Sequence, residues 1–267
     1  MYIEGQSSWL YDSPELLHSY QELLPCDGLR SLSFVHADGH CPLPIFPEHR
    51  RFISMKRLIT ANIKSLIRLA VAGNVLWACD MPLLSNIVDM ILISPKDLSG
   101  LPYLFTHCTQ MQSFTLHVDS GECDEFSAIL HNHSDAFPLL KSCKLRFAAA
   151  PSTQLNVAAE FLRKKPFLEC LDFKNAFEIA SGSNISNEPV LKLLSDLPHL
   201  RVFGCSINQK ELTPDHLRRL CQYIPPQLNA LALTLYMDES TVTEADWEEF
   251  VGPVLFRGPH YILTSAS

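Results

Sequence analysis

The side chains best suited to covalent chemistry in this sequence are its nine cysteines: Cys26, Cys41, Cys79, Cys108, Cys123, Cys143, Cys170, Cys205 and Cys221. A catalytic thiol needs a base and an orienting group beside it. No two cysteines form a Cys-x-x-Cys pair, and no local signature or Gly-x-Ser-x-Gly motif is present. We therefore expect a protein that is not an enzyme, with reduced and mostly buried thiols and a cytoplasmic or nuclear location. A cysteine-dependent hydrolase is the less favoured alternative.

Two histidine clusters contain metal-binding side chains. His36, His40 and Cys41 form one cluster, and His131 with His133 forms the other. Zinc takes four ligands, usually supplied as closely spaced pairs. Neither cluster has a second pair nearby in the sequence, and no glycine-rich phosphate loop is present. We expect loops with incidental histidines, no metal and no cofactor.

The composition excludes several classes of partner. The 267 residues are 47% hydrophobic and 19% charged, enough to build a substantial core, and their formal net charge is −8. An acidic chain does not favour nucleic acid, because phosphates are neutralised by a basic surface. The longest apolar region, residues 66–78, is interrupted by Arg68 and Asn74. We therefore expect no membrane span, and the first residues lack the pattern of a secretory signal.

A short apolar pattern, Leu-x-x-Leu-x-Leu read loosely, recurs along most of the chain. Its eight copies begin at Leu29, Leu66, Ile87, Met111, Leu140, Leu168, Leu200 and Leu228. The spacings between their starts are 37, 21, 24, 29, 28, 32 and 28 residues. Alternating apolar residues are typical of a strand with one buried face. The recurrence therefore predicts a repeat protein with one short strand in each repeat.

Almost every copy of the pattern follows a segment that reads as a helix. Such segments are expected at 14–24, 48–60, 100–108, 124–132, 153–165 and 214–223, and a further one is expected to begin after Asn187, with Pro189 in its first turn. Ser13, Ser152, Asn187 and Thr213 stand where a polar side chain satisfies the first backbone N–H groups of a helix. A helix and a strand repeated at roughly 28 residues bury their apolar faces only by stacking.

The predicted class is therefore α/β: a solenoid with a parallel concave sheet and helices on the convex side. We expect a single domain over 1–267, with about eight irregular repeats over roughly 14–235 and a C-terminal cap over roughly 236–267. A two-domain α/β protein is the structural alternative, but it lacks the glycine-rich ligand loop such folds use.

These repeats resemble the leucine-rich-repeat superfamily of the ribonuclease-inhibitor-like type. Residues 66–76 match the full Leu-x-x-Leu-x-Leu-x-x-Asn-x-Leu, and Asn208 holds the asparagine position in a later repeat. The segments FLRKKPFLECLDF and LLSDLPHLRVFGC resemble the irregular repeats of fungal F-box proteins. The resemblance implies non-catalytic protein binding, and an F-box would add an Skp-type adaptor and a cullin. No convincing F-box is present, so a free-standing scaffold is the alternative.

The residues between the apolar positions map the concave face, where solenoids usually bind their partners. The candidate partner-binding residues are Thr115, His117, Lys141, Lys144, Arg146, Glu169, Asp172, Lys174 and Arg201. Opposite charges facing each other across strands favour a specific protein partner. The alternative is a solvated face whose charges only pair with one another.

Two segments lie outside the repeat pattern. The stretch 238–249 holds six acidic residues, and Thr243 begins a predicted helix whose Trp247 and Phe250 pack on the last repeat as a cap. A docking site for a basic partner is the alternative there. Residues 36–50 contain three prolines and account for the longest spacing, so we expect a loop.

Overall fold

The structure is a computed structural model of the chain. It describes residues 28–34, 50–93, 97–118, 122–147, 150–175, 187–255 and 260–266. Two compact units divide it, Met1–His117 and Val118–Ser267, and each is described by itself. The predicted helix at 14–24 and the loop with His36, His40 and Cys41 lie outside the described residues.

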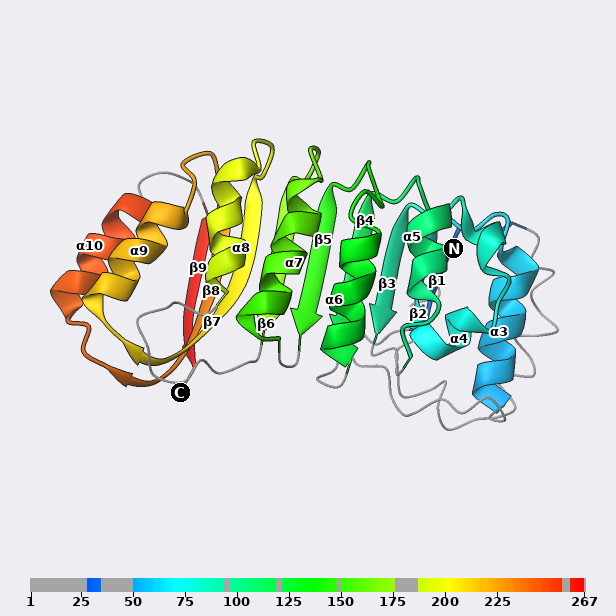
Figure 1. Cartoon of the computed structure of the whole chain (residues 1–267), viewed down its shortest axis with the longest axis horizontal. Coiled ribbons are helices and arrows are strands. Elements are labelled where there is room, and N and C mark those ends of the chain that lie inside the picture. The colour runs from blue at the N-terminus through cyan, green and yellow to red at the C-terminus, as the bar shows by residue number, and fades with distance from the viewer. Residues whose placement is uncertain are drawn as a thin grey trace. The chain divides into compact units, whose positions relative to one another are not determined.

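The first unit repeats a strand followed by helical turns (Figure 1). Its elements are β1 (Ser31–Ser33), α3 (Arg50–Asn62), β2 (Arg68–Ala72), α4 (Gly73–Trp77), the 3-10 turn η1 (Met81–Leu84), β3 (Asp89–Ile93), α5 (Leu101–His107) and β4 (Ser113–Val118). The strands are parallel and stand in chain order, with Leu69 opposite Met90 and Met90 opposite Phe114. α4 and η1 were not predicted, because their repeat spans only 21 residues and shows no helical period.

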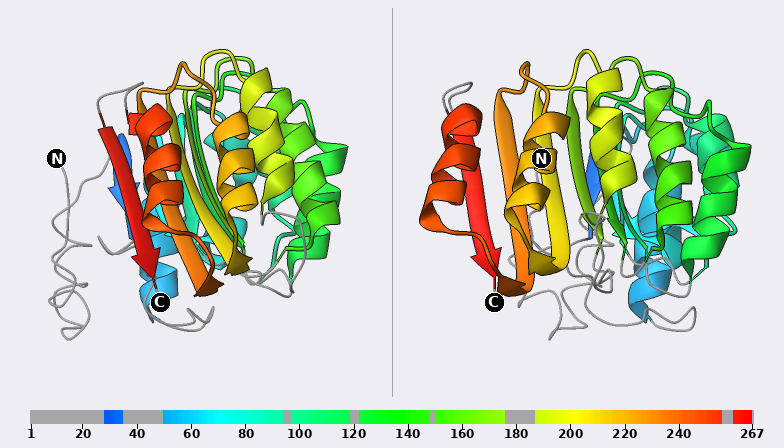
Figure 2. Two further views of the ribbon diagram at one scale, coloured as in Figure 1. Left: turned by 90° about the vertical axis from the view of Figure 1, so that its left-hand side faces the viewer. Right: turned by 60° about the vertical axis from the view of Figure 1, so that its left-hand side comes forward.

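The second unit continues the same alternation. Its elements are α6 (Cys123–Asn132), β5 (Ser142–Phe147), α7 (Ser152–Arg163), β6 (Cys170–Asn175), α8 (Glu188–Leu193), η3 (Leu194–Asp196), β7 (Val202–Leu212), α9 (Pro214–Tyr223), β8 (Ala230–Ser240), α10 (Glu244–Leu255) and β9 (His260–Ala266). β5 to β9 form a parallel sheet in chain order. In both views of Figure 2 the helices lie on one side of these strands, and no described helix covers the other face of the sheet, which is called the open face below.

The apolar triads explain where the strands form. In all eight repeats the strand begins two residues after the first triad residue. The second and third triad residues then point inward, as Leu171 and Phe173 do with no exposed surface. The predicted α/β class, a parallel sheet of leucine-rich repeats with helices on one side, is confirmed.

The helix starts follow the sequence signals with two differences. Thr213 caps α9 as predicted, with its hydroxyl accepting from the His216 backbone N–H and the His216 ring accepting from the Thr213 N–H. Ser152 is the first residue of α7, not its cap. Asn187 precedes α8 but does not cap it, because its side-chain amide instead donates to the backbone carbonyl of Ser206.

A ninth strand follows the predicted C-terminal helix. α10 begins at Glu244, after the reciprocal hydrogen bonds of Thr243 and Asp246, and Phe250 is buried. β9 then pairs with β8, with Tyr261 opposite Leu231. The sequence analysis missed β9 because Gly258 occupies its first triad position.

Asparagine side chains join neighbouring repeats of the second unit. Asn208 stands at the asparagine position of the repeat pattern and is half-buried, and its side chain donates to the Asn175 carbonyl at 3.1 Å. The buried Asn175 side chain binds both the N–H and the carbonyl of Ala150, at 3.0 and 2.9 Å. Asn74, the other match, lies in α4 instead. Asn175 was missed because it stands one residue before the expected position.

Candidate functional site

The open face of β5 and β6 carries most of the predicted site residues. Both strands alternate strictly between half-buried and buried residues. The half-buried set contains the predicted Lys144, Arg146, Asp172 and Lys174. The alternation follows from the period of two in a strand, which sends the apolar triad residues to the helix side. The four charges therefore share one face.

Lys144 and Asp172 neutralise each other. They stand opposite in the strand register, and the Lys144 Nζ lies 3.0 Å from the Asp172 Oδ2. Asp172 leans toward β7, where a Cβ added to Gly204 would lie 3.0 Å from its Oδ1. Glycine at this strand position thus leaves room for the carboxylate. Lys144 and Asp172 therefore match the alternative interpretation of this face, in which its charges pair with one another.

Arg146 and Lys174 form the next row of the sheet, and they do not form an ion pair with each other because both are cations. The two cations stand opposite each other on β5 and β6. Among the described residues no carboxylate pairs with either of them. The Arg146 Nε is buried and has no hydrogen-bond acceptor in the described part of the chain. Within the described residues this row is therefore a positive site without a paired carboxylate, on a chain whose net charge is −8.

The remaining charged candidates of this unit line the start of the strands. The Glu169 N–H donates to the Lys141 carbonyl, and the Arg201 N–H donates to the Glu169 carbonyl. These three exposed residues therefore occupy equivalent positions in consecutive repeats, with alternating charge. They lie where the strands begin, whereas Arg146 and Lys174 lie near the ends of β5 and β6.

The open face changes character at β7 and β8. Val202 is 40% exposed and stands opposite Ala230. Gly204 stands opposite the exposed Ala232, and Tyr236 is 47% exposed. Small and apolar residues make this part low and hydrophobic beside the charged strands. This surface could not be predicted from the sequence, because alanine and glycine have no functional group that indicates a binding site.

Thr115 and His117 belong to the first unit. Both are half-buried on β4, where Thr115 stands opposite Ile91. They share the outward alternation of that strand, with Phe114 and Leu116 buried between them.

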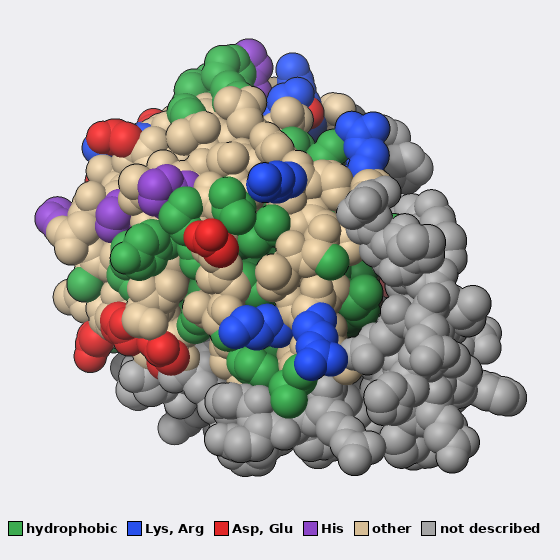
Figure 3. Space-filling model, turned by 90° about the vertical axis from the view of Figure 1, so that its right-hand side faces the viewer, with side chains coloured by type: hydrophobic (Ala, Val, Ile, Leu, Met, Phe, Trp, Pro, Cys, Tyr) green, Lys and Arg blue, Asp and Glu red, His purple; other side chains and the backbone are tan. Residues whose placement is uncertain are grey.

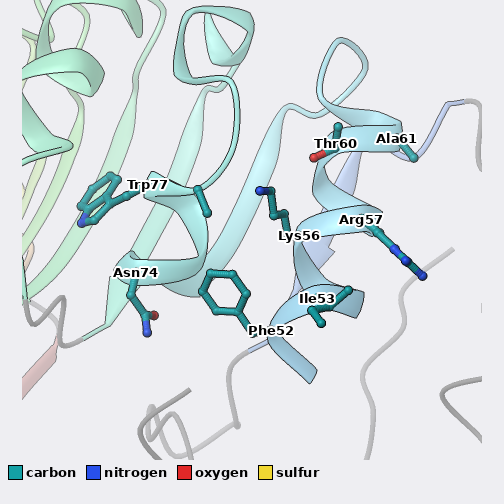
Figure 4. A pocket seen from close by; sticks show the side chains of 9 residues that line it. Phe52, Ile53, Lys56, Arg57, Thr60, Ala61, Asn74 and Trp77 are labelled. Carbon is teal, nitrogen blue, oxygen red and sulfur yellow. The ribbon is translucent and has the colours of Figure 1, made fainter. Parts of the chain in front are cut away.

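The helix side of the first unit contains a groove of about 950 Å³ between α3 and α4. Phe52 and Lys56 extend from α3 toward α4, whereas Arg57 points away (Figure 4). The end that carries α3 shows hydrophobic side chains interspersed with Lys and Arg (Figure 3). Trp77 of α4 also lines the groove. The sequence analysis missed it because α4 was not predicted.

Five of the described cysteines have thiols with a raised pKa. Burial raises the pKa of Cys108, Cys143 and Cys205 to about 12, and desolvation also raises the pKa of Cys79 and Cys170. The thiolate is the nucleophilic form, so these thiols are poorly reactive at neutral pH. Cys143 and Cys205 occupy buried triad positions, as expected.

Across the described ranges, no three His, Cys, Asp or Glu side chains form a group able to hold a metal ion. His131 lies in the last turn of α6. No helix in the part of the chain that the structure describes is sufficiently long and apolar to cross a membrane.

No protein-family model matches the chain, and no curated protein matches it either. Among solved structures, the chain is similar to an internalin from Listeria monocytogenes. The identity is 12% and the TM-score 0.39, and the match covers 76% of this chain and 56% of that one. The chain thus corresponds to little more than half of that protein, and a similarity of this level assigns no activity or partner.

Proposed function

We propose that this chain is a non-catalytic protein-interaction module that binds its partner on the open face of β5 to β8. The observation that carries the proposal is the composition of that face. Two cations on β5 and β6, to which no described carboxylate is paired, lie on the same sheet as the exposed apolar residues of β7 and β8. Interfaces combine an apolar centre with polar groups that set specificity, and a strand array with one free face provides such a surface.

The test is site-specific photo-crosslinking from the proposed face. A benzophenone amino acid replaces Val202 or Ala232, which are both exposed on the sheet. The matched control places it at Glu125, which is exposed on α6 on the helix side. We expect both sheet positions to crosslink one common protein that Glu125 does not. Crosslinks from Glu125 alone would disprove the proposal.

A narrower form of the proposal follows from the resemblance to F-box proteins. The two segments that carry it form the end of α7 with β6, and the end of α8 with β7. In this form the repeats hold a substrate, while an Skp-type adaptor and a cullin join through an F-box. Affinity capture separates the two forms, because recovery of both adaptor and cullin supports the ligase role. Their absence beside a crosslinked partner supports a free-standing scaffold.

A further inference from the structure

Arg146 and Lys174 form a site with unused binding capacity. Neighbouring strands lie about 4.8 Å apart, so residues opposite in the register have adjacent side chains. Like charges in this position destabilise a sheet. The row of Lys144 and Asp172 avoids this cost through its ion pair. The row of Arg146 and Lys174 has no such compensation among the described residues.

From this arrangement we propose that Arg146 and Lys174 bind a carboxylate side chain of an acidic segment in the partner protein. This inference rests on the proposed function and adds the chemistry of the partner. A guanidinium binds a carboxylate in a planar, two-pronged geometry, and an ammonium adds a point charge beside it. The buried Arg146 Nε–H has no acceptor among the described residues, so the guanidinium gives up no hydrogen bond of this group when it turns toward a carboxylate.

The neighbouring surface indicates what surrounds that carboxylate. On β7 and β8 the exposed Val202, Ala232 and Tyr236 offer apolar contact. A segment that places Glu or Asp on the cation pair and an apolar side chain on β7 and β8 matches both parts. Because the chain has a net charge of −8, long-range electrostatic repulsion opposes the approach of such a segment, and its binding depends on local contacts.

The experiment uses two fluorescent peptides of about a dozen residues, built on the repeats Glu-Val-Ser and Gln-Val-Ser. They differ only in charge, so the first measures carboxylate recognition. Fluorescence polarisation gives the affinity. The Nε–H resonance of Arg146 in a ¹⁵N spectrum reports contact at the site. We expect the Glu peptide to bind and to move that resonance, and the Gln peptide to bind at least about tenfold more weakly.

Three variants locate the effect. Arg146→Met and Lys174→Met should each weaken the Glu peptide by about tenfold or more. The double variant Glu160→Gln with Arg163→Met removes an ion pair of α7, on the helix side, at constant net charge and should leave the affinity unchanged. Circular dichroism checks that each variant is folded.

Three results would overturn the inference. They are no binding of the Glu peptide, equal binding of the Gln peptide, or an affinity that Arg146→Met and Lys174→Met do not change. If a peptide with phosphoserine in place of Glu binds and the Glu peptide does not, the ligand is a phosphate group and the proposed carboxylate is wrong. Crosslinking from Val202 and Ala232 tests the broader function separately, because it requires no acidic group.

Discussion

Lys165 is a charged residue at a position where other repeats have an apolar one. Three residues before the triad, five other repeats among the described residues bury an apolar side chain: Ile63, Leu84, Cys108, Phe137 and Leu197. Lys165 is equally buried, at 1% exposure, and its Nζ donates to the carbonyls of Ser134 and Ala136. The same Nζ lies 4.0 Å from the centre of the Phe161 ring. Burial lowers the pKa of Lys165 to about 8.

This pKa predicts a stability that depends on pH. Between about pH 8 and the ordinary value of 10.5, the unfolded chain holds a proton at Lys165 that the folded chain has lost. The free energy of unfolding of the wild type should therefore rise across this range relative to Lys165→Met. Urea unfolding at several pH values measures the difference. The exposed neighbour Lys164→Met is the control, and a difference for Lys165→Met that stays flat with pH would contradict the assignment.

The ring of Trp77 lies so close to Gly100 that it leaves no room for a side chain at this residue. A Cβ at this residue would overlap the ring of Trp77, whose Nε1 donates to the Asp97 carbonyl. Gly100→Ala should cost about 1–3 kcal/mol through overpacking and change the tryptophan emission. Urea unfolding and fluorescence measure both effects. Gly28→Ala is not a matched control because its φ is 115°, so Ala78→Gly, which removes a methyl group where Gly100→Ala adds one, serves instead. An unchanged emission for Gly100→Ala would place Trp77 elsewhere.

At the scale of the element, the cap of α9 is the clearest sequence signal. Thr213→Ala removes the hydroxyl that accepts from the His216 N–H and should destabilise the protein by about 1 kcal/mol. Thr106→Ala is the matched control, because Thr106 is exposed within α5 and caps no helix. It should change stability by less than about 0.5 kcal/mol. Equal effects of the two variants in urea unfolding would show that the cap contributes nothing specific.

The elements also show what the sequence could predict. The strands could be predicted because every second residue is buried and apolar, as at Leu171 and Phe173, and this alternation is visible in the sequence. The outward residues followed from the same alternation. Which charges pair could not be predicted, because Lys144 reaches Asp172 only through the register between two strands. α4 and β9 were missed where the repeat is short or begins with glycine.

At the scale of the whole molecule, β9 protects a longer strand. β8 has 11 residues and β9 has 7, and β9 pairs with β8 from Ala230 to Tyr236. A chain ending at Leu255 exposes the longer edge, and long unpaired edges promote association. We expect a lower melting temperature and a concentration-dependent increase in mass by light scattering. A chain lacking only Ser267 is the control, and a truncated chain that stays monomeric with the same melting temperature would refute this role.

The direction of the backbone hydrogen bonds has a consequence for how the protein is made. The N–H groups that begin β6, β7 and β8 donate to carbonyls of the preceding repeat, as Glu169 does to Lys141. The ammonium of Lys165 likewise finds its acceptors in Ser134 and Ala136, about thirty residues earlier in the chain. A ribosome releases the N-terminal side first. Each repeat of the second unit therefore emerges when the carbonyl groups that it needs have already been synthesised, so translation itself supplies the template for the next strand.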